Sequence, residues 1–184
     1  MNNNYNLKLA EDTVFFIEKS LENVFHNRSI QIYRRLDDIL RIFKEEKVST
    51  SHFSQSTGIG HDDISRQKID DVFARFFHAK KAAVRVQFVS GTHAISSVLF
   101  GVLRPGDLML SITGNPYDTL EEVIGIRGKE KGSLLEFGIE YKQINICEKI
   151  DTFEEKLDGF FKNNSCKLVF IQKSCGYSWR KSLT

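Results

Sequence analysis

Two segments near the N-terminus place apolar side chains at the spacing of amphipathic helices. In residues 9–27, and again in the segment that follows, apolar positions recur with helical spacing and charged residues lie between them. The apolar positions are Leu9, Ile17, Leu21, Val24 and Phe25 in the first segment, and Ile32, Leu36, Ile39, Leu40 and Phe43 in the second. We predict two helices that form an N-terminal arm, followed by a polar loop over residues 49–58.

Beyond this loop, apolar runs alternate with helical stretches. A third amphipathic helix is predicted from Ile69, Val72, Phe73 and Phe76. The predicted strands are 82–89, 108–112, 139–146 and 167–172, and the predicted helices between and after them are 92–103, 117–126 and 152–161. Strands separated by helices of this length favour right-handed crossovers and a mainly parallel sheet. The pattern therefore predicts an α/β fold.

The junction between the strand at 82–89 and its helix is the turn Ser90-Gly91-Thr92. N–H groups at the start of a helix, assisted by the two hydroxyls, can bind a phosphate. The local pattern leaves a second interpretation open, in which Ser90 or Thr92 only caps the helix.

Composition narrows the possible partners. The formal net charge is +2, from 26 basic and 24 acidic residues, so no strong field favours nucleic acid. The three cysteines have no CxxC spacing, which argues against a disulfide framework or a zinc site. No basic and apolar leader begins the chain, and no run of about 18 apolar residues occurs. We expect a cytoplasmic protein that binds neither nucleic acid nor membrane.

Several blocks of sequence, in this order, resemble one known family. The blocks are residues 58–66 (Gly-Ile-Gly-His-Asp-Asp-Ile-Ser-Arg), 89–95 (Val-Ser-Gly-Thr-His-Ala-Ile), 103–107, 112–128, 132–139 and 176–180 (Gly-Tyr-Ser-Trp-Arg). From Gly58 to Leu183 the chain resembles the aluminium-resistance proteins, also called the methionine gamma-lyase family. These are pyridoxal-phosphate proteins with the aspartate-aminotransferase-type fold.

The resemblance implies a domain organisation and an activity. Residues 1–57 are expected to be the helical arm, and residues 58–184 an incomplete pyridoxal-phosphate-binding large domain. The intact enzyme is expected to be a carbon–sulfur lyase acting on a sulfur amino acid. The Schiff-base lysine of the family lies in a later motif that this chain does not contain. We therefore expect a truncated chain, inactive alone, whose partner is a further copy in a homo-oligomer or a missing C-terminal polypeptide.

The resemblance also assigns roles to individual residues. The turn Ser90-Gly91-Thr92 would hold the cofactor phosphate, with His93 close to the cofactor. Tyr117 would lie against the pyridine ring, although an ordinary tyrosine at a helix start remains the alternative. Arg66 would reach the phosphate of a neighbouring subunit.

A second group of assignments concerns the substrate and metals. Tyr177 and Arg180, in the loop 174–180, would bind the substrate, with Arg180 on its carboxylate, unless this loop is an unstructured tail. The family usually has Arg at position 175, Pro at 181 and Tyr at 61, where this chain has Cys175, Lys181 and His61. We read the pair at 62–63 as capping or loop aspartates and predict no metal site.

Two other functions fit the same sequence. One is a non-catalytic remnant or interaction fragment whose exposed sheet edge needs another polypeptide. The other is a small phosphate-binding α/β domain.

Overall fold

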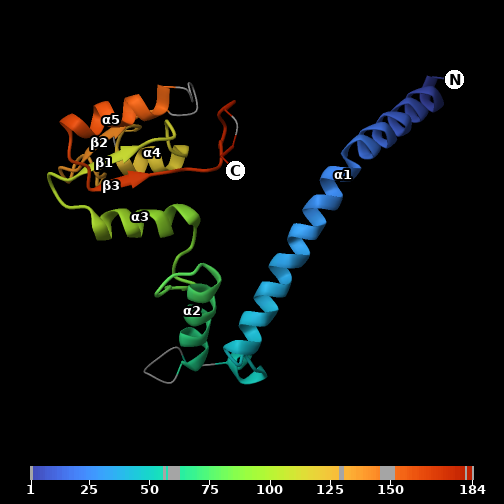
Figure 1. Cartoon of the computed structure of the whole chain (residues 1–184), viewed down its shortest axis with the longest axis horizontal. Coiled ribbons are helices and arrows are strands. Elements are labelled where there is room, and N and C mark those ends of the chain that lie inside the picture. The colour runs from blue at the N-terminus through green and yellow to red at the C-terminus, as the bar shows by residue number, and fades with distance from the viewer. Residues whose placement is uncertain are drawn as a thin grey trace. The chain divides into compact units, whose positions relative to one another are not determined.

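The computed structural model describes residues 2–55, 57, 63–128, 131–145, 152–180 and 182–183, with side chains from residue 6 onward. The chain divides into two compact units, Met1–Val86 and Gln87–Thr184 (Figure 1). The division between an arm, 1–57, and a domain, 58–184, rests on the family resemblance and stays a prediction.

The first unit begins with a single long helix, α1, Asn2–Glu45. Sequence analysis predicted two helices here, and that prediction was wrong. Residues 1–57 contain neither Gly nor Pro, so no strong helix breaker separates the two apolar segments. The helix ends at Glu45, and the chain then turns at Lys47, which has a positive φ of 53°.

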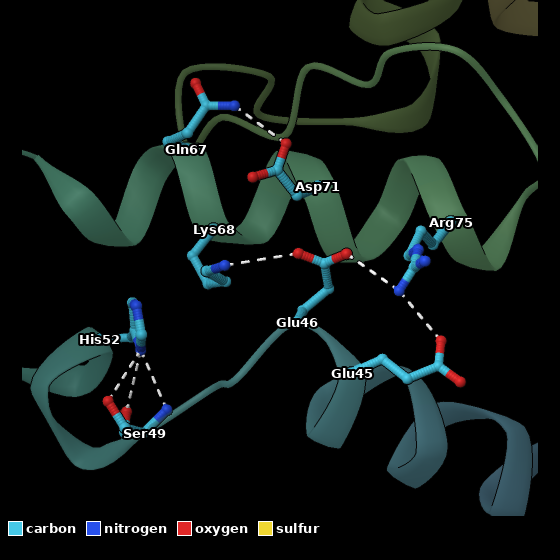
Figure 2. Close-up of polar contacts among 8 residues, drawn as sticks. All are labelled: Glu45, Glu46, Ser49, His52, Gln67, Lys68, Asp71 and Arg75. Carbon is cyan, nitrogen blue, oxygen red and sulfur yellow. Dashed lines mark hydrogen bonds and ion pairs between the residues drawn. The ribbon is translucent and has the colours of Figure 1, made fainter.

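Polar contacts join the end of α1 to the second helix of this unit, α2, Ile64–Phe76 (Figure 2). Arg75 Nη1 lies 2.9 Å from Glu45 Oε2 and 3.2 Å from Glu46 Oε1. Lys68 Nζ lies 3.4 Å from the other carboxylate oxygen of Glu46. Because these side chains are partly exposed, the ion pairs orient the two helices more than they stabilise the unit.

In the described part of the connection between these helices, a side chain bonds to the backbone. The 3-10 helix η1, Thr50–Phe53, begins after Ser49, whose backbone N–H donates to His52 Nδ1 at 3.0 Å (Figure 2). The predicted polar loop at 49–58 therefore contains one turn of helix in its described part.

The helices α1 and α2 also contact each other through apolar side chains. Ile42 and Val72 are buried in this contact. A cavity of about 230 Å³ remains between the helices. Its lining consists of Ile39, Ile42, Phe43, Val72, Phe73, Phe76 and Phe77. The C-terminal part of the apolar face of α1 is thus used inside its own unit.

Residues 82–89, all of which the structure describes, form no strand. The predicted strand was wrong because a strand forms only by pairing, and this segment pairs with a side chain instead. Val84 N–H and Arg85 Nη1 each donate to Asp70 Oδ1 at 2.7 Å, and Arg85 Nη2 donates to Oδ2 at 2.8 Å. The bond from Arg85 holds the pKa of Asp70 below its usual value.

The second unit is built around a parallel sheet whose order, within the described part of the chain, is β2-β1-β3. The strands are β1, Leu108–Ser111, β2, Glu140–Gln143, and β3, Leu168–Phe170. All four residues of the central strand are buried. The predicted strands at 108–112, 139–146 and 167–172 are confirmed in shorter form, Ile146 lying outside the described residues, and the parallel pairing confirms the α/β class.

The helices of this unit are α3, Gly91–Val102, α4, Asp118–Ile124, and α5, Phe153–Asn163, which confirms the helices predicted at 92–103, 117–126 and 152–161. The helices α3 and α4, but not α5, contribute to one apolar core with the sheet and the chain that leads into β2. The core residues are Leu99, Leu103, Met109, Ile124, Leu134 and Ile139. Across the residues that the structure describes, no helix combines the length and apolar content that crossing a membrane requires.

Candidate functional site

Ser90 caps α3. Its φ of −156° is extended, its Oγ accepts the N–H of His93 at 3.1 Å, and its carbonyl accepts the N–H of Ala94. The capping interpretation of this serine therefore holds. The cap uses the third and fourth N–H groups of the helix start, so those of Gly91 and Thr92 are left to face a ligand.

Space at this turn is open. A Cβ atom built on Gly91 would meet no atom within 4 Å. Gly91 is also not among the glycines with positive φ. Neither the backbone conformation nor a described neighbour therefore requires a glycine at position 91, and the open side admits an approaching anion.

A hydroxyl pair connects this turn to the next helix. Thr92 Oγ1 lies 2.8 Å from Thr119 Oγ1, in the first turn of α4. Two helix starts are thereby brought together, each with a hydroxyl at the contact. Tyr117, the N-cap residue of α4, lies two residues before Thr119.

The ring of Tyr117 stacks on that of Tyr177. The ring centroids are 5.6 Å apart and the planes are inclined by 30°. The Tyr117 hydroxyl donates to that of Tyr177 at 3.4 Å, and this hydrogen bond raises the pKa of Tyr117 above its ordinary value near 10. Tyr117 is 38% exposed, so Tyr177 covers only part of it.

Gln172, which the sequence analysis missed, holds this arrangement to the sheet. Its Oε1 accepts the backbone N–H of Tyr117 at 2.9 Å. Its own N–H donates to Thr113 Oγ1 at 3.0 Å. Thr113 is buried just beyond β1, and Gln172 lies just beyond β3, so the carboxyl ends of both strands anchor Tyr117.

The signal for Gln172 was present but weak. It is the first polar residue after the apolar run Leu168–Ile171. Open α/β sheets bind ligands at the carboxyl ends of their strands, so the rule that indicated Tyr117 and the loop 174–180 applies to Gln172 as well.

The loop after Gln172 is held by Arg180. One guanidinium nitrogen, Nη2, donates to the carbonyls of Gln172, at 2.9 Å, and Ser174, at 2.5 Å. Gly176, with a φ of +56°, lies so close to Tyr117 that an added Cβ would be 3.4 Å from the ring. Arg180 therefore shapes the loop, and its role toward a substrate stays a prediction.

Two other predicted site residues have local partners. The ring of His93 meets Phe88 edge-on, with centroids 5.6 Å apart. Arg66 belongs to the other unit, where its N–H donates to the Asp63 carboxylate at 3.0 Å and its guanidinium lies 3.4 Å from the same group. Asp63 is thus the N-cap of α2, as predicted for one of the paired aspartates, whereas His61 lies outside the described residues.

The structure thus gathers Thr92, Tyr117 and Tyr177 with Gln172 and Arg180 at one edge of the sheet. This cluster offers hydroxyls, free helix-start N–H groups and an aromatic face. It can bind an anion beside a flat ring.

Solved structures resemble the chain over nearly its whole length. A candidate cystathionine beta-lyase involved in aluminium resistance from Clostridium acetobutylicum is 44% identical, with a TM-score of 0.80, and the match covers 98% of this chain and 42% of that one. A carbon–sulfur lyase involved in aluminium resistance from Clostridium novyi NT is 41% identical, with a TM-score of 0.79, and the match covers 99% of this chain and 42% of that one.

Comparison with known sequences also finds a relative that is similar over nearly the whole of this chain. The uncharacterised protein YnbB of Bacillus subtilis is 41% identical over 179 residues, which are 95% of this chain and 42% of the relative. The chain therefore spans less than half the length of these relatives. The sequence model described as methionine gamma-lyase matches residues 10–184, and the chain belongs to the methionine gamma-lyase family.

Proposed function

We propose that the chain forms the N-terminal part of a cytoplasmic pyridoxal-phosphate-dependent carbon–sulfur lyase that acts on a sulfur amino acid, with the aspartate-aminotransferase-type fold. The family and the two lyases among the similar structures support this proposal. The observation that carries it is the hydroxyl contact between Thr92 and Thr119, because it joins the anion-binding turn to the helix that bears Tyr117.

The residues present fit this cofactor. The N–H groups of Gly91 and Thr92 belong to the first turn of α3, where a phosphate would bind, and the open side of Gly91 leaves room for it. The partly exposed ring of Tyr117 offers a flat apolar contact for a pyridine ring. Bound pyridoxal phosphate supplies an electron sink that allows the Cα–H bond of an amino acid to break.

This chain's own residues would bind the cofactor and orient it. The turn 90–92 fixes the phosphate end, and Tyr117 fixes the plane of the ring. The hydrogen bond to Tyr177 raises the pKa of Tyr117 further above its ordinary value near 10, so the Tyr117 hydroxyl is neutral in the range where the cofactor would bind. Arg180 and Tyr177 place the loop 174–180 beside this ring, where a substrate carboxylate would bind.

The proposal also concerns the polypeptides that would contact this chain. The side chains of Val169 and Ile171 at the β3 edge are exposed, which is unusual for a parallel sheet. We expect a further polypeptide segment to cover this edge and supply the reactive lysine, and the complete enzyme to be a homo-oligomer to which Arg66 contributes across the interface.

Titration of the chain with pyridoxal phosphate tests the site. Gly91→Val places a branched side chain where the phosphate would approach, without forcing a left-handed backbone. We expect at least a tenfold loss of affinity, or about 1.4 kcal/mol. The matched control is Gly101→Val, in the same helix and equally free of close neighbours.

Circular dichroism confirms that both variants keep their helices. Equal affinity of Gly91→Val and Gly101→Val would show that the turn is not the phosphate site. Inorganic phosphate that binds as tightly as pyridoxal phosphate would favour the simple phosphate-binding domain, since the ring would then contribute nothing.

A further inference from the structure

The N-terminal part of α1 carries a coiled-coil pattern. Leu7, Val14 and Leu21 are spaced by seven residues, and Ala10, Ile17 and Val24 follow each of them by three. These are the a and d positions of three heptads. Such a pattern in a single helix predicts that its apolar side faces another helix.

The apolar side continues beyond the third heptad. Beyond Val24 the large apolar residues on this side are Phe25, which lies four residues after Leu21, and then Ile32 and Leu36. A seven-residue repeat drifts by about 20° per heptad around a straight helix, and a four-residue step returns it by about 40°. One straight stripe results, which we name the α1 seam. It consists of Leu7, Ala10, Val14, Ile17, Leu21, Val24, Phe25, Ile32 and Leu36.

The α1 seam is open to solvent. Its large side chains are between 37% and 64% exposed. By contrast, Ile39, Ile42 and Phe43, farther along the same helix, line the contact with α2. The exposed stretch from Leu7 to Leu36 is about 44 Å long at 1.5 Å per residue.

A second copy of this chain offers a partner for the α1 seam, because its own α1 seam has the same length and the same apolar side chains. Eight large apolar side chains, each presenting somewhat under about 100 Å² at this exposure, give on the order of 1,000 Å² or more when two copies meet. Specific interfaces bury about 1,200–2,000 Å² in total. A heptad stripe is also self-complementary, because each a or d side chain fits the space between those of an equivalent helix.

Charge sets the direction of the pairing. Residues 2–24 of α1 carry four acidic and two basic side chains, a net charge of −2, whereas residues 25–45 carry three acidic and five basic side chains, a net charge of +2. A parallel pair would place like halves together, whereas an antiparallel pair places each acidic half against a basic one.

We propose that α1 is a dimerisation helix, which pairs through the α1 seam with the antiparallel α1 of a second copy. The pairing concerns the first unit alone and does not depend on the cofactor site.

The oligomeric state of the full chain tests the proposal. Sedimentation equilibrium should show self-association, and Ile17→Asp should weaken it at least 100-fold, because the new carboxylate is buried against an apolar partner. Phe16→Asp is the control. Phe16 is 72% exposed and lies about 140° around the helix from Leu21, so this variant should associate like the unchanged chain. Circular dichroism verifies that both variants remain helical.

Cysteine variants test the direction. In an antiparallel overlap of residues 7–36, position 21 lies beside its own copy and position 7 faces position 36. Mild oxidation should therefore cross-link Leu21→Cys, whereas Leu7→Cys should give no more dimer than the unchanged chain. A monomeric chain at about 100 µM, equal association of Ile17→Asp and Phe16→Asp, or efficient cross-linking through position 7 would overturn the proposal.

Discussion

Tyr117 is partly exposed to solvent, and contacts with neighbouring residues hold it in place. Gln172 accepts its backbone N–H, Tyr177 covers part of its ring, and Gly176 lies beside the ring with a left-handed backbone. The sequence identified Tyr117 and Tyr177 as separate candidates, but it could not show that the two rings stack. Their contact joins positions sixty residues apart, and no local pattern encodes such a distance.

Tyr177→Phe should lower the pKa of Tyr117 toward its ordinary value, because the substitution removes the hydroxyl that accepts its proton while keeping the stacked ring. Carbon NMR of isotope-labelled tyrosine rings measures this shift. Tyr33→Phe, at an exposed position of α1, should leave the titration of Tyr117 unchanged. An unaltered pKa in Tyr177→Phe would mean that the hydroxyl contact is not formed in solution.

The sign of the pH dependence follows from the raised pKa. The neutral hydroxyl pair contributes stability at every pH below the ordinary value near 10, and this contribution is lost as the pH rises through the raised value. The Tyr117–Tyr177 contact should therefore be intact throughout the neutral range.

The helix α4 depends on a glycine at its end. Gly125 has a φ of +98°, and a Cβ atom there would lie only 2.5 Å from Ser133 Oγ. The left-handed conformation alone disfavours any other residue, and the segment packed against it adds a steric clash.

Gly125→Ala should destabilise the second unit by about 2 kcal/mol or more, because backbone strain and the clash act together. Gly159→Ala makes the same change inside α5, where no atom lies within 4 Å, and should stabilise by up to about 1 kcal/mol. Urea unfolding followed by circular dichroism compares the two. Similar midpoints for both variants would contradict the geometry at the end of α4.

The helices and the three strands of the second unit were predicted from local pattern, whereas the single helix α1 and the unpaired segment 82–89 were not. The helices α3, α4 and α5 begin and end within about two residues of their predicted bounds, because spacing and turn residues are local. Residues 82–89 have the composition of a strand but bind Asp70, and strand pairing is decided by residues far away in the sequence. The single helix α1 was not predicted, because two separate apolar segments indicate two helices unless the absence of Gly and Pro between them is also considered.

At the scale of the whole molecule, large apolar side chains remain at the surface of both units. Trp179, the only tryptophan, is fully exposed at 103%, and Tyr177 is 82% exposed. Patches of this kind mark surfaces that meet another polypeptide.

The fluorescence of Trp179 would report directly on contact with another polypeptide. In the chain alone its fluorescence should resemble that of a solvated indole and be quenched freely by acrylamide. Adding the C-terminal remainder of a relative should shift the emission to shorter wavelength and reduce quenching, because the indole becomes covered. A shielded Trp179 in the chain alone would show that the loop 174–180 is already covered.

The hydrogen bonds of Gln172 also have an evolutionary consequence. One side chain serves Tyr117 through its carbonyl oxygen, while its backbone N–H is received by the hydroxyl of Thr113. A substitution at 172 that lacks an acceptor would release the start of α4, and the loss of the hydroxyl at 113 would leave a partly buried donor without its acceptor. Because both donors are backbone N–H groups, positions 172 and 113 are each expected to keep a side chain that accepts a hydrogen bond among homologous genes, whichever residue stands at 117.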